Sequence, residues 1–147
     1  MLKALNGKTL VTAESCTGGG IGAALTAISG SSTVYKGGII SYTNEVKSHL
    51  LGVGVEVLER FGAVSAPVAA AMAAGARKVL CADVAVSVTG LAGPGGDQYG
   101  NPVGTVYIGY EDASKSLVKK FLFKGDREEV RNQTIEMALK IVLENNK

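Results

Sequence analysis

Cysteine, tryptophan and proline are scarce in this sequence, and each scarcity narrows the class of protein. Over 147 residues there are two cysteines, three prolines and no tryptophan. The cysteines, Cys16 and Cys81, do not form a CxxC pair, so the sequence indicates neither a zinc site nor a disulfide framework. We therefore expect no bound metal, and two reduced cysteines are typical of a cytoplasmic protein.

Long apolar runs and strong net charge are also missing. No run of about 18 apolar residues would span a membrane, and the amino-terminal residues lack the apolar core of a signal peptide. The formal net charge is only +2, and no block of Lys or Arg favours nucleic acid. We expect a soluble cytoplasmic protein with neither a membrane nor a nucleic-acid partner.

The composition favours a single α/β domain over residues 1–147. Hydrophobic residues make up 46% of the chain, which is enough for one core. Strand signals separated by helical patterns predict a mixed, mostly parallel sheet, and two late strands around Asp112-Ala113-Ser114 predict a carboxy-terminal antiparallel hairpin. The expected strands are 9–13, 34–42, 83–89, 103–111 and 117–124, and the expected helices are 1–6, 21–28, 45–51, 55–60, 66–81 and a last helix capped by Asp126.

The stretch from Val11 to Gly20 carries the strongest chemical signal. A short strand leads through Ser15, Cys16 and Thr17 into a glycine run that opens a helix. The first N–H groups of a helix lack partners within it and its dipole favours negative charge, so this corner suits an anion or a developing oxyanion. Ser15 is the candidate nucleophile. The structural alternative is a cap and turn, because Ser, Thr and Gly satisfy backbone groups at such corners.

The same glycines also match a dinucleotide-binding fingerprint. Gly18 to Ala23 have the spacing GxGxxA directly after a strand. That fingerprint needs an acidic residue about 20 positions further on, and residues 37–41 contain none. We therefore do not predict a dinucleotide fold, although the glycines would let a substrate approach the backbone closely.

Lys47 is the candidate base, near the start of the short helix expected over 45–51. Thr43 or Asn44 would cap this helix. The positive end of the helix dipole and burial both disfavour an ammonium group, so they lower the pKa of a lysine and suit it to proton transfer. An exposed first-turn lysine is the structural alternative. His49, the only histidine, is expected on the helix surface.

Two further features predict ligand binding. Residues 89–97 form a glycine-rich loop at the carboxyl end of a buried strand. Open α/β sheets bind ligands at that end, and the N–H groups of glycine turns can cradle phosphate. Arg127 and Arg131 lie one turn apart at the start of the last helix, where they would form either a phosphate clamp or ordinary surface pairs.

Several motifs together resemble the CinA carboxy-terminal domain family, the nicotinamide-nucleotide amidohydrolases. They lie in the family's order and span nearly the whole chain. The longer members carry a further amino-terminal domain, and we expect this protein to be the stand-alone form without it. The matching stretches are residues 13–19 (AESCTGG), 38–44 (GIISYTN) with Lys47, 62–65 (GAVS), 89–96 (TGLAGPGG) and 102–106 (PVGTV).

The resemblance implies a three-layer α/β/α fold and hydrolysis of nicotinamide mononucleotide to nicotinate mononucleotide and ammonia, in pyridine nucleotide salvage and without metal or cofactor. By position, Ser15 resembles the nucleophile, Lys47 the base and Tyr42 the partner of that base. Spacing does not choose between the two arginines as the phosphate contact. The expected substrate-binding residues are Cys16, Thr17, Gly18, Gly19, Thr89, Gly90, Gly93, Gly95, Gly96, Arg127 and Arg131.

This activity fits the chemistry of the side chains. A serine hydroxyl needs a base and oxyanion donors to attack an amide, and the backbone N–H groups of residues 16–19 are the expected donors. The alternative is a non-catalytic nucleotide-binding module linked to competence or DNA damage, which does not need Ser15, Tyr42 and Lys47 to converge. An alanine-rich helix and a free hairpin edge also favour a homo-oligomer.

Overall fold

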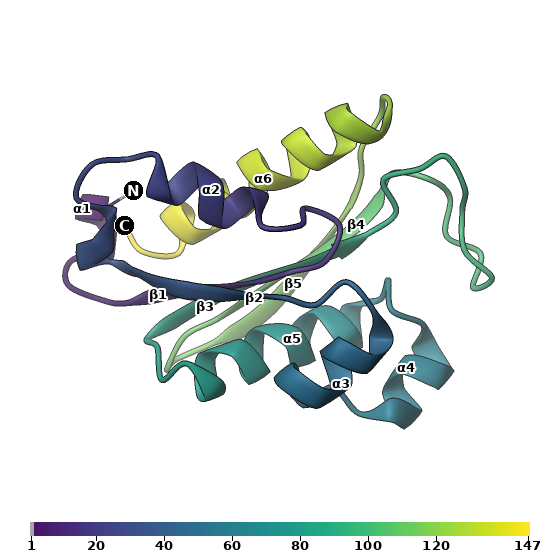
Figure 1. The fold of residues 1–147 in the computed structure, drawn as a ribbon, viewed down its shortest axis with the longest axis horizontal. Coiled ribbons are helices and arrows are strands. Elements are labelled where there is room, and N and C mark those ends of the chain that lie inside the picture. The colour runs from purple at the N-terminus through teal and green to yellow at the C-terminus, as the bar shows by residue number, and fades with distance from the viewer. Residues whose placement is uncertain (1) are drawn as a thin grey trace.

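The computed structural model describes residues 2–147 and has three layers (Figure 1). Met1, the first residue of the expected 1–6 helix and of the expected 1–147 domain, lies outside the described residues. Over residues 2–147 the elements are α1 Leu2–Leu5, β1 Leu10–Glu14, α2 Gly20–Thr26, a 3-10 turn Ser31–Thr33, β2 Tyr35–Ile40, α3 Asn44–Leu51, α4 Val55–Phe61, α5 Ala66–Val79, β3 Val84–Gly90, β4 Thr105–Glu111, β5 Ser116–Leu122 and α6 Arg127–Glu144.

The strands form one mixed sheet in the order β2-β1-β3-β4-β5. β1 lies in the middle of three parallel strands, between β2 and β3. β3 pairs with β4, and β4 with β5, in antiparallel fashion, so β5 runs in the same direction as the first three strands. The predicted fold class, a mixed and mostly parallel sheet that ends in an antiparallel hairpin, is confirmed.

Helices cover both faces of the sheet, with α2 and α6 on one side and α3, α4 and α5 on the other (Figure 1). All five residues of β1 are buried, as expected for a central strand covered on both faces. Successive side chains of a strand point to opposite faces. Leu10 accordingly belongs to the core that contains α6, and Val11 and Ala13 belong to the core that contains α5.

The carboxyl ends of β1, β2 and β3 meet at one edge of the sheet, which is where open α/β sheets bind ligands. The segments that follow these strands are residues 15–19, 41–43 and 91–104. The predicted nucleophile, base and glycine loop all come from these segments or from the helix that follows one of them. The parallel part of the sheet therefore brings them to the same edge.

α3, which carries Lys47, is fixed by its caps and by close contact with α5. The Thr43 hydroxyl accepts a hydrogen bond from the Val46 N–H at 3.4 Å, and Gly52 ends the helix with a left-handed φ of 70°. A side chain at Gly75 of α5 would overlap the backbone carbonyl of Leu51. Glycine at this position therefore lets α3 end directly against α5, with its inner face turned toward the sheet.

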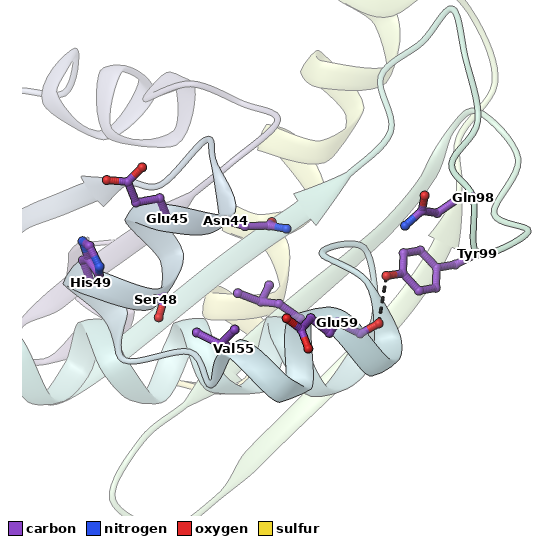
Figure 2. A pocket seen from close by; sticks show the side chains of 9 residues that line it. Asn44, Glu45, Ser48, His49, Val55, Glu59, Gln98 and Tyr99 are labelled. Atoms are coloured by element: carbon purple, nitrogen blue, oxygen red, sulfur yellow. Dashed lines mark hydrogen bonds between the residues drawn. The ribbon is translucent and has the colours of Figure 1, made fainter.

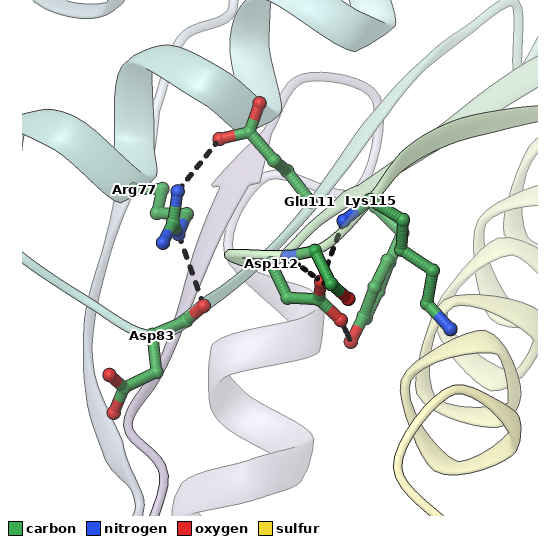
Figure 3. A network of polar contacts seen from close by, with 7 residues as sticks. Arg77, Asp83, Glu111, Asp112 and Lys115 are labelled. Carbon is green, nitrogen blue, oxygen red and sulfur yellow. Dashed lines mark hydrogen bonds and ion pairs between the residues drawn. The ribbon is translucent and has the colours of Figure 1, made fainter.

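A polar network lies at the opposite end of the sheet, where the parallel strands begin and β4 ends (Figure 3). Arg77 forms an ion pair with Glu111 at 3.5 Å and donates a hydrogen bond to the Asp83 carbonyl at 3.1 Å. Partial burial raises the pKa of Asp112, but hydrogen bonds from the Tyr110 hydroxyl and from the hairpin turn outweigh it and hold the pKa at about 2. This network lies at the end of the sheet remote from the candidate site.

Candidate active site

Ser15 and Lys47 meet at the carboxyl edge of the sheet. Ser15 follows β1 directly, and its N–H extends the ladder by donating to the Val88 carbonyl at 3.2 Å. Its side chain is buried, and the Lys47 amine donates a hydrogen bond to its Oγ at 3.0 Å across 32 positions of sequence. Two residues singled out from separate sequence motifs are thus in direct contact.

Lys47 is buried without a carboxylate partner. It is 1% exposed, and its Nζ donates to the carbonyls of Ser41 at 2.8 Å and Tyr42 at 3.1 Å in addition to Ser15. Within residues 2–147 the one ion pair closer than 4.0 Å is that of Arg77 and Glu111. Burial lowers the pKa of Lys47 from 10.5 to about 8, with Cys16 acting weakly in the opposite direction. The neutral amine is therefore accessible near neutral pH.

In the neutral form of Lys47, the hydrogen bonds of the amine leave only one direction open for its lone pair. A protonated lysine has three N–H donors, and all three have acceptors here. After loss of one proton, the carbonyls of Ser41 and Tyr42 still accept two N–H groups, and the remaining position faces Ser15. The lysine can then accept a proton from the serine hydroxyl, which is the arrangement that general-base catalysis requires.

The side chains of Cys16 and Thr17 in the 15–19 turn are buried. The Thr17 hydroxyl is fully buried and donates to Glu14, while burial raises the pKa of the Cys16 thiol to about 11 and keeps it protonated. The Gly18 N–H is occupied by the Ser15 carbonyl at 3.1 Å. Over residues 2–147 the N–H groups of Cys16, Thr17 and Gly19 have no acceptor, but Thr17 is 0% exposed. The N–H groups of Cys16 and Gly19 are therefore the two expected oxyanion donors left for a ligand.

A small pocket of about 120 Å³ lies beside this turn. Arg127 crosses it, donating to the Gly93 carbonyl at 2.6 Å and to the Tyr42 hydroxyl at 3.3 Å. Six of the expected site residues therefore share one pocket. Its lining consists of Cys16, Tyr42, Gly90, Leu91, Ala92, Gly93, Gly95 and Arg127.

Six expected substrate-binding residues lie outside that lining. Three of them belong to the turn described above (residues 17–19), and the other three make structural contacts. The Thr89 hydroxyl is buried and donates to the Ala63 carbonyl at 2.8 Å. Gly96 sits against the backbone of Asn101, where an added side chain would come within 2.7 Å of the carbonyl. Arg131 donates to the carbonyls of Cys16 and Thr17, both at 3.0 Å, so it braces the turn while Arg127 faces the pocket.

Tyr42 contacts Lys47 through its main chain rather than through its phenol group. Tyr42 as a whole is 62% exposed and its hydroxyl accepts from Arg127, whereas its backbone carbonyl accepts from the Lys47 amine. Tyr42 therefore contacts the Lys47 amine through its main chain and also lines the pocket.

Two residues of this region were not singled out from the sequence, namely Glu14 and Ser41. Both are buried, at 2% and 0% exposure. Glu14 accepts from Thr17 of the Ser15 turn, and the Ser41 carbonyl accepts from Lys47 itself. The available signal for Glu14 was its position, an acid at the end of a fully buried strand and directly before a helix start. Ser41 had no comparable signal, because its contact to Lys47 is made by the backbone.

A larger hollow of about 510 Å³ lies on the outer side of α3 (Figure 2). Neither it nor the smaller pocket is lined by Ser15 or Lys47, but the smaller pocket is lined by Cys16, the residue directly after Ser15. The charged side chains of the larger hollow other than histidine are the acids Glu45 and Glu59. His49 lies there on the exposed side of α3, as predicted. The acidic lining disfavours a phosphate-bearing ligand, so the smaller pocket is the candidate site.

Two kinds of feature do not occur within residues 2–147. No cluster of three or more His, Cys, Asp or Glu side chains is arranged to hold a metal ion. No helix in the described part of the chain combines the length and the apolar character that a membrane span requires.

Comparison with known proteins agrees with the resemblance seen in the motifs. The model of the CinA C-terminal domain family matches residues 1–145. The chain belongs to the CinA family. A CinA-like protein of Parasynechococcus marenigrum is 50% identical over 136 residues, which cover 91% of this chain and 32% of that protein. A CinA-like protein of Citrifermentans bemidjiense is 48% identical over 134 residues, covering 91% and 32%.

Solved CinA structures share the fold over nearly the whole chain. The competence or damage-inducible protein of Enterobacter asburiae is 34% identical with a TM-score of 0.96, covering 99% of this chain and 93% of its own. The competence/damage inducible protein CihA of Agrobacterium tumefaciens is 43% identical with a TM-score of 0.92, covering 96% and 87%. This CinA chain spans about a third of the length of the curated relatives it matches.

The lowered pKa of Lys47 predicts how stability depends on pH. Between pH 8 and 10.5 the unfolded chain keeps the lysine proton and the folded chain loses it, so raising the pH favours the folded state. Relative to Lys47→Met, the unfolding free energy of the wild type should rise by up to about 1.4 kcal/mol per pH unit in this window. Urea denaturation of both proteins at several pH values measures this difference. Parallel pH curves would show that Lys47 titrates normally.

Proposed function

We propose that this CinA domain hydrolyses the carboxamide of nicotinamide mononucleotide to nicotinate mononucleotide and ammonia, in pyridine nucleotide salvage. Ser15 is the nucleophile and Lys47 the base. The observation that carries the proposal is the hydrogen bond of 3.0 Å between Lys47 Nζ and Ser15 Oγ, made by a lysine that is buried without a carboxylate. Such an amine is suited to activate a serine hydroxyl at neutral pH, as in Ser–Lys variants of the catalytic triad.

In the first step, the neutral amine of Lys47 takes the proton of the Ser15 hydroxyl while Oγ attacks the carboxamide carbon. The carbonyl oxygen becomes an oxyanion, and the free N–H groups of residues 16 and 19 are the donors proposed to stabilise it. Arg131 holds two carbonyls of the same turn, so it keeps these donors in place without contacting the substrate.

The tetrahedral intermediate collapses when the Lys47 ammonium gives its proton to the departing amine, which leaves as ammonia. The nicotinoyl group is then an ester on Ser15 Oγ. Water attacks this ester with Lys47 again accepting a proton, which releases the carboxylate product and returns the proton to Ser15. Each step uses the same short contact between Lys47 and Ser15, so no second acid or base is required.

The pocket favours a small planar amide joined to a charged group. Its volume of about 120 Å³ is well below the roughly 300 Å³ at which pockets for whole ligands begin, so only the ring of a mononucleotide would lie inside. The ribosyl phosphate would then extend past Tyr42 and Arg127. Both are exposed at the mouth, where a guanidinium suits phosphate and an aromatic ring suits stacking.

The competing function is a non-catalytic nucleotide-binding module, which the competence and damage names of several relatives favour. Burying a lysine without a carboxylate costs folding free energy, and nucleotide binding alone does not require it. The contact between Lys47 and Ser15 therefore favours the enzyme. Ammonia release from nicotinamide mononucleotide by the purified chain distinguishes the two functions.

The neighbouring residues Ser15 and Cys16 offer a matched pair of variants. Ser15→Ala should lower kcat/KM for ammonia release by at least about 1,000-fold, because it removes the nucleophile. Cys16→Ala should stay within about tenfold of the wild type, since a thiol whose pKa is raised to about 11 is a poor nucleophile. The decisive assay is steady-state ammonia release from proteins with wild-type circular dichroism. A folded Ser15→Ala protein with near-normal rates would contradict the mechanism.

The two arginines should differ when the substrate lacks its phosphate. Arg127→Met should raise KM for nicotinamide mononucleotide about 10- to 100-fold, the range expected for loss of a charged hydrogen bond, and should change KM for nicotinamide riboside by less than about threefold. Arg131→Met should lower kcat for both substrates, because it releases the 15–19 turn. Equal losses on both substrates with Arg127→Met would contradict a phosphate contact.

A further inference from the structure

We infer that Glu14 is a positioning residue that holds the two halves of the Ser15 and Lys47 pair together. Its side chain fixes the turn that carries Ser15, and its main-chain carbonyl fixes the segment that holds Lys47. This inference rests on the proposed function of the same site. Glu14 is a buried acid that supports this site without touching the reacting atoms.

The side chain of Glu14 is directed to the α2 face of the sheet by the pleat of β1. Its carboxylate accepts hydrogen bonds from the Thr17 hydroxyl at 2.6 Å and from the N–H groups of Ile21 at 2.9 Å and Gly22 at 3.0 Å. The residue before α2, Gly19, makes no side-chain cap. Glu14 therefore takes the place of a capping residue and ties the 15–19 turn to the start of α2.

The main chain of Glu14 reaches the other half of the site. Its carbonyl accepts from the Ser41 N–H at 2.7 Å and from the Ser41 hydroxyl at 3.3 Å. The carbonyl of Ser41 in turn accepts from the Lys47 amine at 2.8 Å. One residue thus links the turn that carries the nucleophile to the acceptor that aims the base.

Burial makes these contacts obligatory. Glu14 is 2% exposed, and no ion pair within residues 2–147 involves it. A buried carboxylate is tolerated only when hydrogen bonds replace its lost hydration, so its three short donors must stay in place. If the turn shifted relative to α2, the Glu14 carboxylate would either become exposed or stay buried without its hydrogen-bond donors. Catalytic contacts tolerate little displacement, and a shift of about 1 Å can cost about 100-fold in rate.

The test uses Glu14→Gln, which keeps the length of the side chain but replaces one acceptor oxygen with an NH₂ group that faces N–H or O–H donors. Two rates are measured as a function of pH: ammonia release from nicotinamide mononucleotide, and labelling of Ser15 by a fluorophosphonate, in which Oγ displaces fluoride from phosphorus. Both should fall at least about tenfold, with kcat reduced more than KM and with the pH midpoint unchanged, because Lys47 keeps its surroundings.

Two further variants distinguish a misplaced site from a protein that does not fold. Thr17→Val removes a single contact to the carboxylate and should lower both rates about threefold or more, so it carries the test if Glu14→Gln does not fold. Asp83→Asn is the matched control, since Asp83 also accepts from a backbone N–H at 2.8 Å and a threonine hydroxyl at 3.1 Å, both of Thr9, but at the opposite end of the sheet. It should lower the melting temperature and leave both rates within about twofold.

A folded Glu14→Gln protein with rates within twofold of the wild type would overturn the inference. A pH midpoint shifted by a full unit would also overturn it, because Glu14 would then take part in the proton chemistry. If the wild type labels at Ser15 but releases no ammonia, the proposed substrate is wrong, and the labelling rates still test the role of Glu14. A wild type that shows neither reaction would overturn both proposals.

Discussion

The burial of one cationic side chain against one hydroxyl is the constraint on which the site depends. The Lys47 amine meets two backbone carbonyls and Ser15 Oγ in place of a carboxylate, and burial lowers its pKa to about 8. A salt bridge would have been the less costly way to bury this lysine, but it would have kept the amine protonated. The same geometry that costs folding free energy makes the neutral amine accessible near neutral pH, as the proposed base requires.

The rest of the fold holds these two side chains in contact. Parallel pairing brings the ends of β1 and β2 side by side, so Ser15 and Ser41 leave the sheet at the same edge. Close contact of α5, at Gly75, with Leu51 holds the end of α3, the helix that carries Lys47, against the same layer. Arg131 of α6 braces the Ser15 turn from the other layer. All three layers therefore contribute to one contact of 3.0 Å.

Much of this could be predicted from the sequence, because the strongest patterns are local. The strand, glycine turn and helix around Ser15, the cap before Lys47 and the hairpin at residues 112–114 all follow from residue types at fixed spacing. The motifs also indicated the family. Contacts made through the main chain were not predictable in this way, since a sequence shows side chains and not which carbonyl accepts. Tyr42 and Ser41 hold Lys47 by such carbonyls.

The different contacts of Arg127 and Arg131 could not be predicted from the sequence for a related reason. They lie one turn apart on α6, and which of them faces the pocket depends on where the 15–19 turn and the glycine loop lie across the sheet. Glu14 was not singled out because an acid in a buried strand cannot be assigned a role until its hydrogen-bond donors are known. Tertiary placement, rather than local propensity, decides each of these roles.

The central claim is that Lys47 loses its proton far below the usual range of a lysine. The most direct measurement is an NMR titration of the lysine side-chain nitrogens in the wild type, with Lys47→Met removing one signal to assign it. The account predicts a midpoint near pH 8 for that signal. A midpoint above pH 10, with the amine protonated throughout the neutral range, would contradict it.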